Sequence, residues 1–201
     1  MKGKFIVLEG LDGAGIATQA TLLAHRLKNA GFSVLLTKEP TNGLIGGISK
    51  AALRGEFKIS PRTLQLLFCA DRAHHLEKEI EPALARGKFV ICDRYLFSTL
   101  SYGYASNVNY KWLRYINLNF RLPDIGILLD VKPNVSMVRV SDAEDGLQLF
   151  EDREKLNRVR QAYLNIAKEF HLKKIDGDSK IDDVSDKVYN LINKGLGGHQ
   201  K

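Results

Sequence analysis

The chain has 201 residues, 44% of them apolar, which is enough to bury the core of one domain. Lys and Arg number 30 and Asp and Glu number 23, so the formal net charge is +7. Because this charge is scattered and accompanies no nucleic-acid-binding motif, we expect no nucleic-acid partner. No apolar run approaches the roughly 20 residues of a membrane-spanning helix, and no signal peptide is evident.

Two cysteines, Cys69 and Cys92, lie far apart in the sequence and in apolar surroundings. They are typical of buried free thiols in a reducing compartment, and indicate neither a disulfide framework nor a metal site. We therefore expect a cytoplasmic protein that binds no membrane.

Short apolar runs bounded by Gly, Pro or charged residues alternate with helical patterns. The runs predict strands at residues 4–9, 33–38, 88–93, 125–131 and 173–176. Because each run is apolar throughout, it suits a strand buried on both faces of a parallel sheet. The helical patterns cover residues 18–30, 44–53, 61–86, 96–105, 112–121, 133–140, 152–170 and 181–193. This alternation predicts one doubly wound α/β domain over residues 1–201, with a five-stranded parallel sheet flanked by helices and ligands beyond the carboxyl ends of the strands.

The first predicted strand runs into a glycine-rich turn, residues 10–15, and a helical pattern follows at once. The spacing Gly10-x4-Gly15 fits a P-loop, whose backbone N–H groups surround phosphate oxygens. A P-loop continues with Lys and then Ser or Thr, whereas this chain has Ile16 and Ala17. These two residues supply neither a cation for the β- and γ-phosphates nor a hydroxyl for Mg²⁺. By itself the turn is compatible with a phosphate site and with an ordinary tight connection.

Charged residues follow the next two buried strands at their carboxyl ends. The second strand ends at Lys38 and the third at Asp93, which Arg94 follows. An acid at the end of a buried strand costs desolvation unless it is paired or near a metal. Asp93 therefore either caps a helix or pairs with Arg94, or it holds Mg²⁺ or its waters while Arg94 binds an anionic oxygen.

The helix that begins at Pro61 carries a second candidate site. Phe68 and Arg72 are four residues apart and share one helical face. A ring beside a guanidinium can stack on a nucleobase and donate hydrogen bonds to its edge. The alternative places Phe68 in the core and pairs Arg72 with an acid such as Glu9.

Three further features remain open to two interpretations or have no assigned chemistry. The hydroxyls of Ser98, Thr99 and Tyr102 either cap a helix or face a sugar or base. The acidic, glycine-containing stretch at residues 141–153 is either a flap over a phosphate site or a surface loop. His74 and His75 have no partners at metal-ligand spacing and are expected at the surface.

In their order and spacing, these residues resemble the thymidylate kinase family over nearly the whole chain. The likeness extends to the stretch LLFCADR at residues 66–72, to LPD at 122–124 and to FE at 150–151. The resemblance implies the P-loop nucleoside monophosphate kinase fold and a homodimer. It also implies that ATP, with Mg²⁺, phosphorylates dTMP to give dTDP and ADP.

The resemblance implies roles for individual residues. ATP phosphates are expected against Gly10, Gly13, Ala14, Gly15, Ile16, Ala17 and Thr18. The dTMP pocket is expected to use Phe68 for stacking, Arg72 for the base edge, and Lys38, Arg94, Ser98, Thr99, Tyr102 and Phe150. The implied catalytic set is Arg94 on the phosphates, Asp93 near Mg²⁺, Asp12 near the acceptor, and Arg139 or Arg153 at a flap, the LID, over residues 141–153.

Ile16 and Ala17 depart from the family pattern at the two positions where it has charge and a hydroxyl. Loss of one such transition-state donor costs on the order of 10²–10³ in rate. We therefore expect a slow kinase. The alternative is a nucleotide-binding pseudokinase or regulatory module without appreciable turnover.

Overall fold

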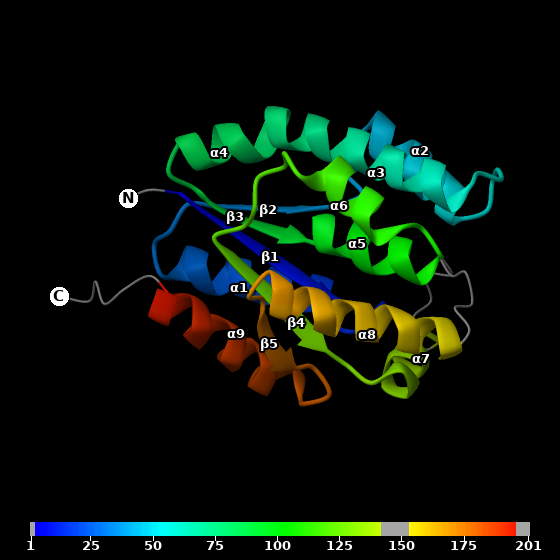
Figure 1. Cartoon of the computed structure of the whole chain (residues 1–201). Helices are drawn as coiled ribbons and strands as arrows, with labels where there is room; N and C mark the ends of the chain where they lie inside the picture. Colours follow the sequence, from blue (N-terminus) through cyan, green and yellow to red (C-terminus); the bar gives the residue numbers. More distant parts are fainter. Residues whose placement is uncertain (1–2, 142–152, 196–201) are drawn as a thin grey trace.

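The computed structural model describes residues 3–141 and 153–195, and Figure 1 shows their arrangement. Five parallel strands form one sheet in the order β2-β3-β1-β4-β5. Their bounds are β1 Lys4–Gly10, β2 Val34–Lys38, β3 Phe89–Asp93, β4 Ile125–Asp130 and β5 Lys173–Asp176. The predicted doubly wound α/β fold is confirmed, and every strand end lies within one residue of its predicted position.

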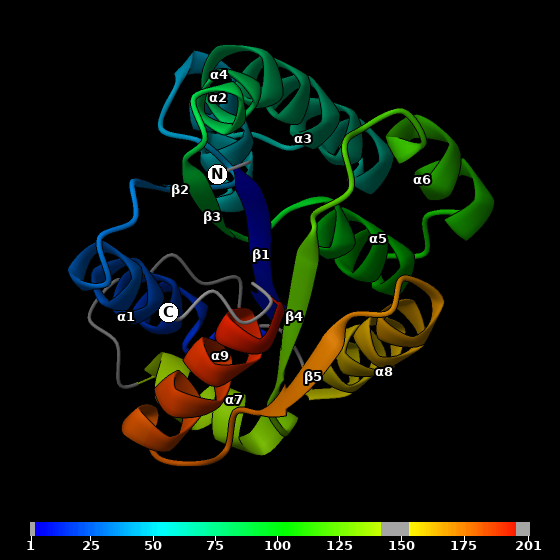
Figure 2. The same ribbon diagram turned by 90° about the vertical axis from the view of Figure 1, so that its left-hand side faces the viewer.

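The central strand β1 is buried on both faces, as its apolar run predicts. Alternate side chains point to opposite faces of a strand. Phe5 and Val7 join an apolar cluster with α5 (Leu96–Ala105) and α8 (Arg153–Glu169). Ile6 and Leu8 join a second cluster with α1 (Ile16–Asn29) and α9 (Ile181–Gly195). Figure 2 shows these two helix pairs on opposite sides of the sheet.

The helical segment predicted at residues 61–86 consists of three consecutive elements. They are α3 Pro61–His75, a π-helical turn η1 Leu76–Ile80, and α4 Glu81–Ala85. The Ser60 hydroxyl accepts a hydrogen bond from Thr63 N at 3.0 Å, which confirms the predicted helix start. The irregular turn precedes Pro82, which has no N–H to donate within a helix.

Besides α3 and α4, three more helices of the described residues lie outside the two pairs that cover the central strand. They are α2 Leu44–Leu53, α6 Tyr110–Asn117 and α7 Pro133–Ser141. The predicted start of α6 at residue 112 was wrong by two residues, because Asn109 caps it by accepting from Trp112 N at 3.0 Å. Among the described residues, no helix has the length and apolar character needed to cross a membrane.

The parallel strands bring their carboxyl ends to one edge of the sheet. Lys38, Asp93 and Leu8 are neighbours in register across β2, β3 and β1. The glycine-rich turn leaves the same edge at the end of β1 and leads directly into α1. This edge therefore collects the charged residues that follow the strands, as parallel-sheet topology requires.

Candidate functional site at the carboxyl edge of the sheet

The glycine-rich turn has the backbone shape of a phosphate-binding loop. Gly13 and Gly15 have φ angles of 73° and 82°, a region that residues with a Cβ rarely adopt. Ala14 N donates to Leu11 O at 3.0 Å, and Gly15 is the N-cap of α1. The turn thus aims the N-terminus of a helix, with its free N–H groups, at the edge of the sheet.

Ile16, at the position where a P-loop has lysine, is buried. Its side chain is 4% exposed and joins the apolar cluster beneath α1. Ala17 and Thr18 are exposed on the following positions of the helix. The turn therefore has the backbone geometry of a phosphate-binding loop, whereas the side chain of Ile16 belongs to the core.

Helix α7 packs against the glycine-rich turn. An added Cβ at Gly13 would lie 2.7 Å from Ser136 O and 3.0 Å from Val140 Cγ2. Ser136 Oγ donates to Asp12 O at 2.6 Å. Arg139 of the same helix donates to Gly177 O at 3.1 Å and lies 3.5 Å from Gly13 O. The predicted flap arginine Arg139 therefore brings a cation to the turn.

Arg94 and Asp12 form the ion pair at the centre of this edge. Arg94 Nη2 lies 2.5 Å from Asp12 Oδ1, and Arg94 Nη1 donates to Gly10 O at 3.0 Å. Tyr102 Oη donates to the other oxygen of Asp12 at 2.8 Å. Burial opposes the charge of Arg94, but the carboxylate of Asp12, together with Tyr102, Tyr163 and Asp93, holds the arginine's pKa well above its ordinary value. The sequence alternative that paired Arg94 with Asp93 was wrong.

Arg94 also has an unusual backbone. Its φ is 66°, in the left-handed region that a non-glycine residue rarely adopts. Its N–H donates to Leu8 O at 2.9 Å, and Cys92 Sγ donates to its carbonyl at 3.0 Å. Such strained positions cost about 1–3 kcal/mol and cluster at functional sites. In this conformation the guanidinium contacts the glycine-rich turn at Gly10 O.

Asp93 ends β3 beside β1 and is a carboxyl group largely removed from water. Burial raises its pKa, while the charges of Arg94 and Lys38 oppose that shift. Among the described residues, no three His, Cys, Asp or Glu side chains gather closely enough to hold a metal alone. Mg²⁺ is commonly held by one or two carboxylates together with substrate phosphates and waters. A single carboxylate beside a phosphate-binding turn therefore fits Mg²⁺.

Arg72 lies in a second, buried cluster on α3. It is 2% exposed and donates from Nε to Glu39 at 2.9 Å, from Nη1 to Asn117 at 2.6 Å and from Nη2 to Thr99 at 3.1 Å. Its guanidinium also lies over two rings, those of Tyr95 at 5.0 Å and Phe120 at 5.5 Å. Burial disfavours the charge of Arg72, but Glu39, together with Cys69 and Tyr95, offsets this and raises the pKa of Arg72.

The acid that pairs with Arg72 is therefore Glu39 from the loop after β2, and the alternative that named Glu9 was wrong. Phe68 lies half-buried one turn before Arg72 on α3. Thr99 and Ser98 come from the first turn of α5, where Thr99 contacts Arg72 and Ser98 contacts Glu9. The structure thus joins Arg72 of α3 to Thr99 of α5, whereas Ser98 belongs to the cluster around Glu9.

His75 was predicted at the surface, and this was wrong. It is 2% exposed, with Nδ1 at 3.1 Å from Glu39 Oε1 and Nε2 at 2.8 Å from Thr37 Oγ1. Glu39 therefore links the histidine to Arg72 inside the protein. The sequence offered one signal for this burial, since His75 lies three residues after Arg72 on the same helical face.

Several predicted residues lie apart from these clusters or outside the described residues. Phe150 and residues 142–152 of the predicted flap are not among the described residues. Arg153 begins α8 and is exposed, while Lys38 is exposed beside Asp93. Sequence reasoning missed the roles of Asn117 and Tyr163, for which no sequence signal exists, because each acts through a contact with a distant segment.

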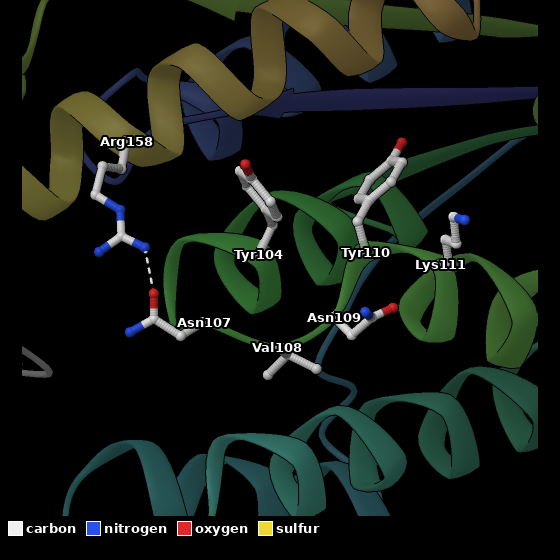
Figure 3. A pocket seen from close by; sticks show the side chains of 7 residues that line it. All are labelled: Tyr104, Asn107, Val108, Asn109, Tyr110, Lys111 and Arg158. Atoms are coloured by element: carbon white, nitrogen blue, oxygen red, sulfur yellow. Dashed lines mark hydrogen bonds between the residues drawn. The ribbon is translucent and has the colours of Figure 1, made fainter.

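A hollow of about 540 Å³ lies between α8 and the connection from α5 to α6 (Figure 3). Figure 3 shows Arg158 reaching from α8 to Asn107, to which its Nη2 donates at 2.6 Å. The other lining residues are Tyr104, Val108, Asn109, Tyr110 and Lys111. None of the residues predicted to bind nucleotides lines this hollow, so it is separate from the edge described above.

A parallel sheet with a glycine-rich turn before a helix, a buried arginine on α3 and an arginine–carboxylate pair defines a P-loop kinase of the nucleoside monophosphate class. Residues 8–188 match the family model described as thymidylate kinase, and the chain belongs to this family. It is 40% identical to the probable thymidylate kinases of Pyrococcus horikoshii and Pyrococcus abyssi, over 98% of this chain and the whole of each relative. It is also 38% identical to the thymidylate kinase of Ruegeria pomeroyi, over 94% of both chains.

Proposed function

We propose that the protein transfers the γ-phosphoryl group of ATP to dTMP and releases dTDP and ADP. The carrying observation is the ion pair between Arg94 and Asp12 of the glycine-rich turn, whose Nη2 and Oδ1 atoms are 2.5 Å apart. Phosphoryl transfer needs little covalent chemistry from the protein and depends on positioning and charge. A guanidinium held beside a phosphate-binding turn supplies both.

The residues divide into a donor side and an acceptor side. The N–H groups of the turn and α1 would hold the ATP phosphates, with the Arg139 cation beside Gly13. On the acceptor side, Phe68 would stack on thymine and Arg72 would donate to its edge, while Arg94 exchanges Asp12 for phosphate oxygens. Bound Mg²⁺, which Asp93 would help to hold, would neutralise phosphate charge.

The reaction is expected to be slow, because Ile16 is buried and contributes no charge to the phosphates. Arg139 compensates in part, since its guanidinium reaches the turn from α7. The homodimer and the cytoplasmic location remain predictions from the sequence. The pseudokinase alternative is resolved by the same assay that tests the kinase.

A coupled assay for ADP formation tests the proposal directly. With ATP and Mg²⁺ present, we expect ADP formation that depends on added dTMP. The Arg94→Ala variant should lose this activity, and Arg94→Lys should restore little of it, because lysine has no planar fork. Arg86→Ala is the matched control, since Arg86 is exposed after α4 at the opposite edge of the sheet. No dTMP-dependent ADP from the wild type would refute the proposal.

A further inference from the structure

Glu9 is a fully buried carboxyl group to which neither the resemblance nor the proposed mechanism gives a role. It lies near the end of β1, one residue before Gly10, and is 0% exposed. Its Oε1 accepts hydrogen bonds from Tyr95 N at 2.9 Å and Ser98 N at 3.2 Å. These contacts tie the turn after β1 to the first turn of α5.

The other oxygen of Glu9 forms a closed triangle with two hydroxyl groups. Ser98 Oγ lies 2.6 Å from Glu9 Oε2, Tyr163 Oη lies 2.9 Å from it, and the two hydroxyl oxygens are 2.8 Å apart. Three hydrogen bonds need three protons, whereas the two hydroxyls supply only two. When Glu9 is ionised, one of the three oxygen–oxygen contacts therefore has no proton between its atoms. The carboxylate charge and the unshared lone pairs then favour a positive charge nearby.

Arg94 supplies that charge. Its Nη1 lies 3.3 Å from Ser98 Oγ and 3.4 Å from Tyr163 Oη, while it donates to Gly10 O at 3.0 Å. The opposite nitrogen, Nη2, faces Asp12. One side of the guanidinium is thus attached to the protein interior, and the other side faces the place expected for phosphate.

Burial raises the pKa of Glu9 to about 7, while Ser98, Arg94 and Tyr163 each act to lower it. The groups that face the triangle come from every neighbouring element. They are Arg94 and Tyr95, which precede α5, Cys92 of β3, and Tyr102 of α5, whose ring meets that of Tyr163 edge-on at 6.1 Å. No other cation contacts the triangle among the described residues.

We propose that Glu9, Ser98 and Tyr163 are positioning residues that hold the Nη1 side of the Arg94 guanidinium. Nη2 then keeps its direction toward the phosphate when substrate displaces Asp12. This inference rests on the proposed function, because it assigns Arg94 to the phosphates. It names two positioning residues, Glu9 and Tyr163, that do not touch substrate. It also moves Ser98 from the predicted dTMP pocket to the support of Arg94.

Tyr163→Phe is the decisive variant, because it removes only the hydroxyl and keeps the ring in the core. We expect kcat for dTMP to fall about tenfold, since the guanidinium loses one of its anchors. The affinity for thymidine, measured by calorimetry, should stay within about twofold, because thymidine carries no phosphate for Arg94 to bind. Tyr110→Phe, which removes a hydroxyl bound to exposed Glu169, is the control and should change neither.

The outcomes separate this inference from the proposed function. If the wild type turns over dTMP and Tyr163→Phe is equally fast, the positioning role is wrong and the kinase assignment stands. A parallel loss of thymidine affinity would show a merely structural role and would also overturn it.

If the wild type shows no turnover, the proposed function fails. The ratio of dTMP to thymidine affinity then decides the positioning role, since a lower ratio in Tyr163→Phe supports it and an unchanged ratio refutes it. Should Tyr163→Phe fail to fold, Ser98→Ala receives the same measurements and the same expectations.

Discussion

Ile16 shows how one side chain changes the chemistry of a phosphate site while the backbone keeps its shape. The side chain is buried in the apolar cluster under α1. A lysine at this position would have to leave that cluster to meet phosphate, and the cavity it leaves costs stability. The sequence alone predicts that Ile16→Lys strengthens ATP binding only if the loop has not repacked. The structure shows the isoleucine packed.

We therefore expect Ile16→Lys to lower the free energy of unfolding by about 2 kcal/mol, with ATP affinity little changed. Urea unfolding measures the first quantity and calorimetry with ATP the second. Ala17→Ser is the control, because Ala17 is exposed and should shift stability by no more than about 0.5 kcal/mol. Unchanged stability together with much tighter ATP binding would contradict this account of Ile16.

Glu9 makes stability depend on pH in a direction opposite to that of an ion-paired carboxylate. The pKa of Glu9 is about 7 in the folded state and its ordinary value is 4.5, so between these pH values the folded state binds a proton that the unfolded state does not. The contribution of Glu9 to the free energy of unfolding is therefore fully present below about pH 4.5 and is lost as the pH rises through about 7.

We expect the stability of the wild type relative to Glu9→Gln to fall by up to about 3 kcal/mol between about pH 4.5 and pH 8. Glutamine has nearly the same shape and does not titrate, so other titrating groups cancel in the comparison. Urea unfolding of both proteins at several pH values measures the difference. A difference independent of pH would mean that Glu9 is ionised throughout.

At the scale of elements, the packing of α7 on the glycine-rich turn explains why position 13 is glycine. An added methyl group there would meet Ser136 O at 2.7 Å, and the φ of 73° disfavours any other residue. We expect Gly13→Ala to cost about 2–3 kcal/mol of stability and to weaken ATP binding, because α7 must move.

Gly55→Ala is a matched control for this prediction. Gly55 has a similar φ of 75°, but an added Cβ would meet nothing within 4 Å. It should cost only about 1 kcal/mol, from the backbone alone, and leave ATP affinity unchanged. Equal effects of the two variants would show that contact with α7 is unimportant. Thermal unfolding and calorimetry with ATP measure both quantities.

The elements could be predicted wherever a residue's neighbours in sequence decide its structure. Uniform apolar runs gave strand ends within one residue, and the serine and proline at 60 and 61 marked the start of α3. The π-helical turn η1 was not predictable, because it depends on how the chain accommodates Pro82 against the sheet. The early start of α6 was missed because Asn109 was not recognised as a cap.

Sequence reasoning placed several charged residues at the carboxyl edge of the sheet, but it missed Asn117 and Tyr163 and did not predict which side chains pair. Parallel strands place Lys38 and Asp93 at one edge whatever the side-chain packing, so sequence reasoning found them. Partner choice depends on contacts between segments that are distant in the sequence. Arg94 therefore pairs with Asp12, and Arg72 with Glu39, although closer or more obvious acids were available to each.

At the scale of the whole molecule, the predicted homodimer needs an exposed apolar surface. Helices α2 and α3 pack together and leave three apolar side chains exposed. The exposed fraction is 85% for Leu44, 42% for Ile48 and 48% for Leu66. We expect sedimentation equilibrium to give twice the chain mass of 22.5 kDa. The double variant Leu44→Asp, Leu66→Asp should be monomeric if this surface forms the interface. A monomeric wild type would refute the homodimer.

The central claim is that the carboxyl edge of the sheet aligns ATP and dTMP although residue 16 carries no charge. The most direct test is a calorimetric titration of dTMP together with initial rates of ADP formation in the presence of Mg²⁺. We predict saturable dTMP binding and a slow turnover that requires both nucleotides. Tight dTMP binding without any dTMP-dependent ADP would contradict the claim and identify the protein as a nucleotide-binding pseudokinase.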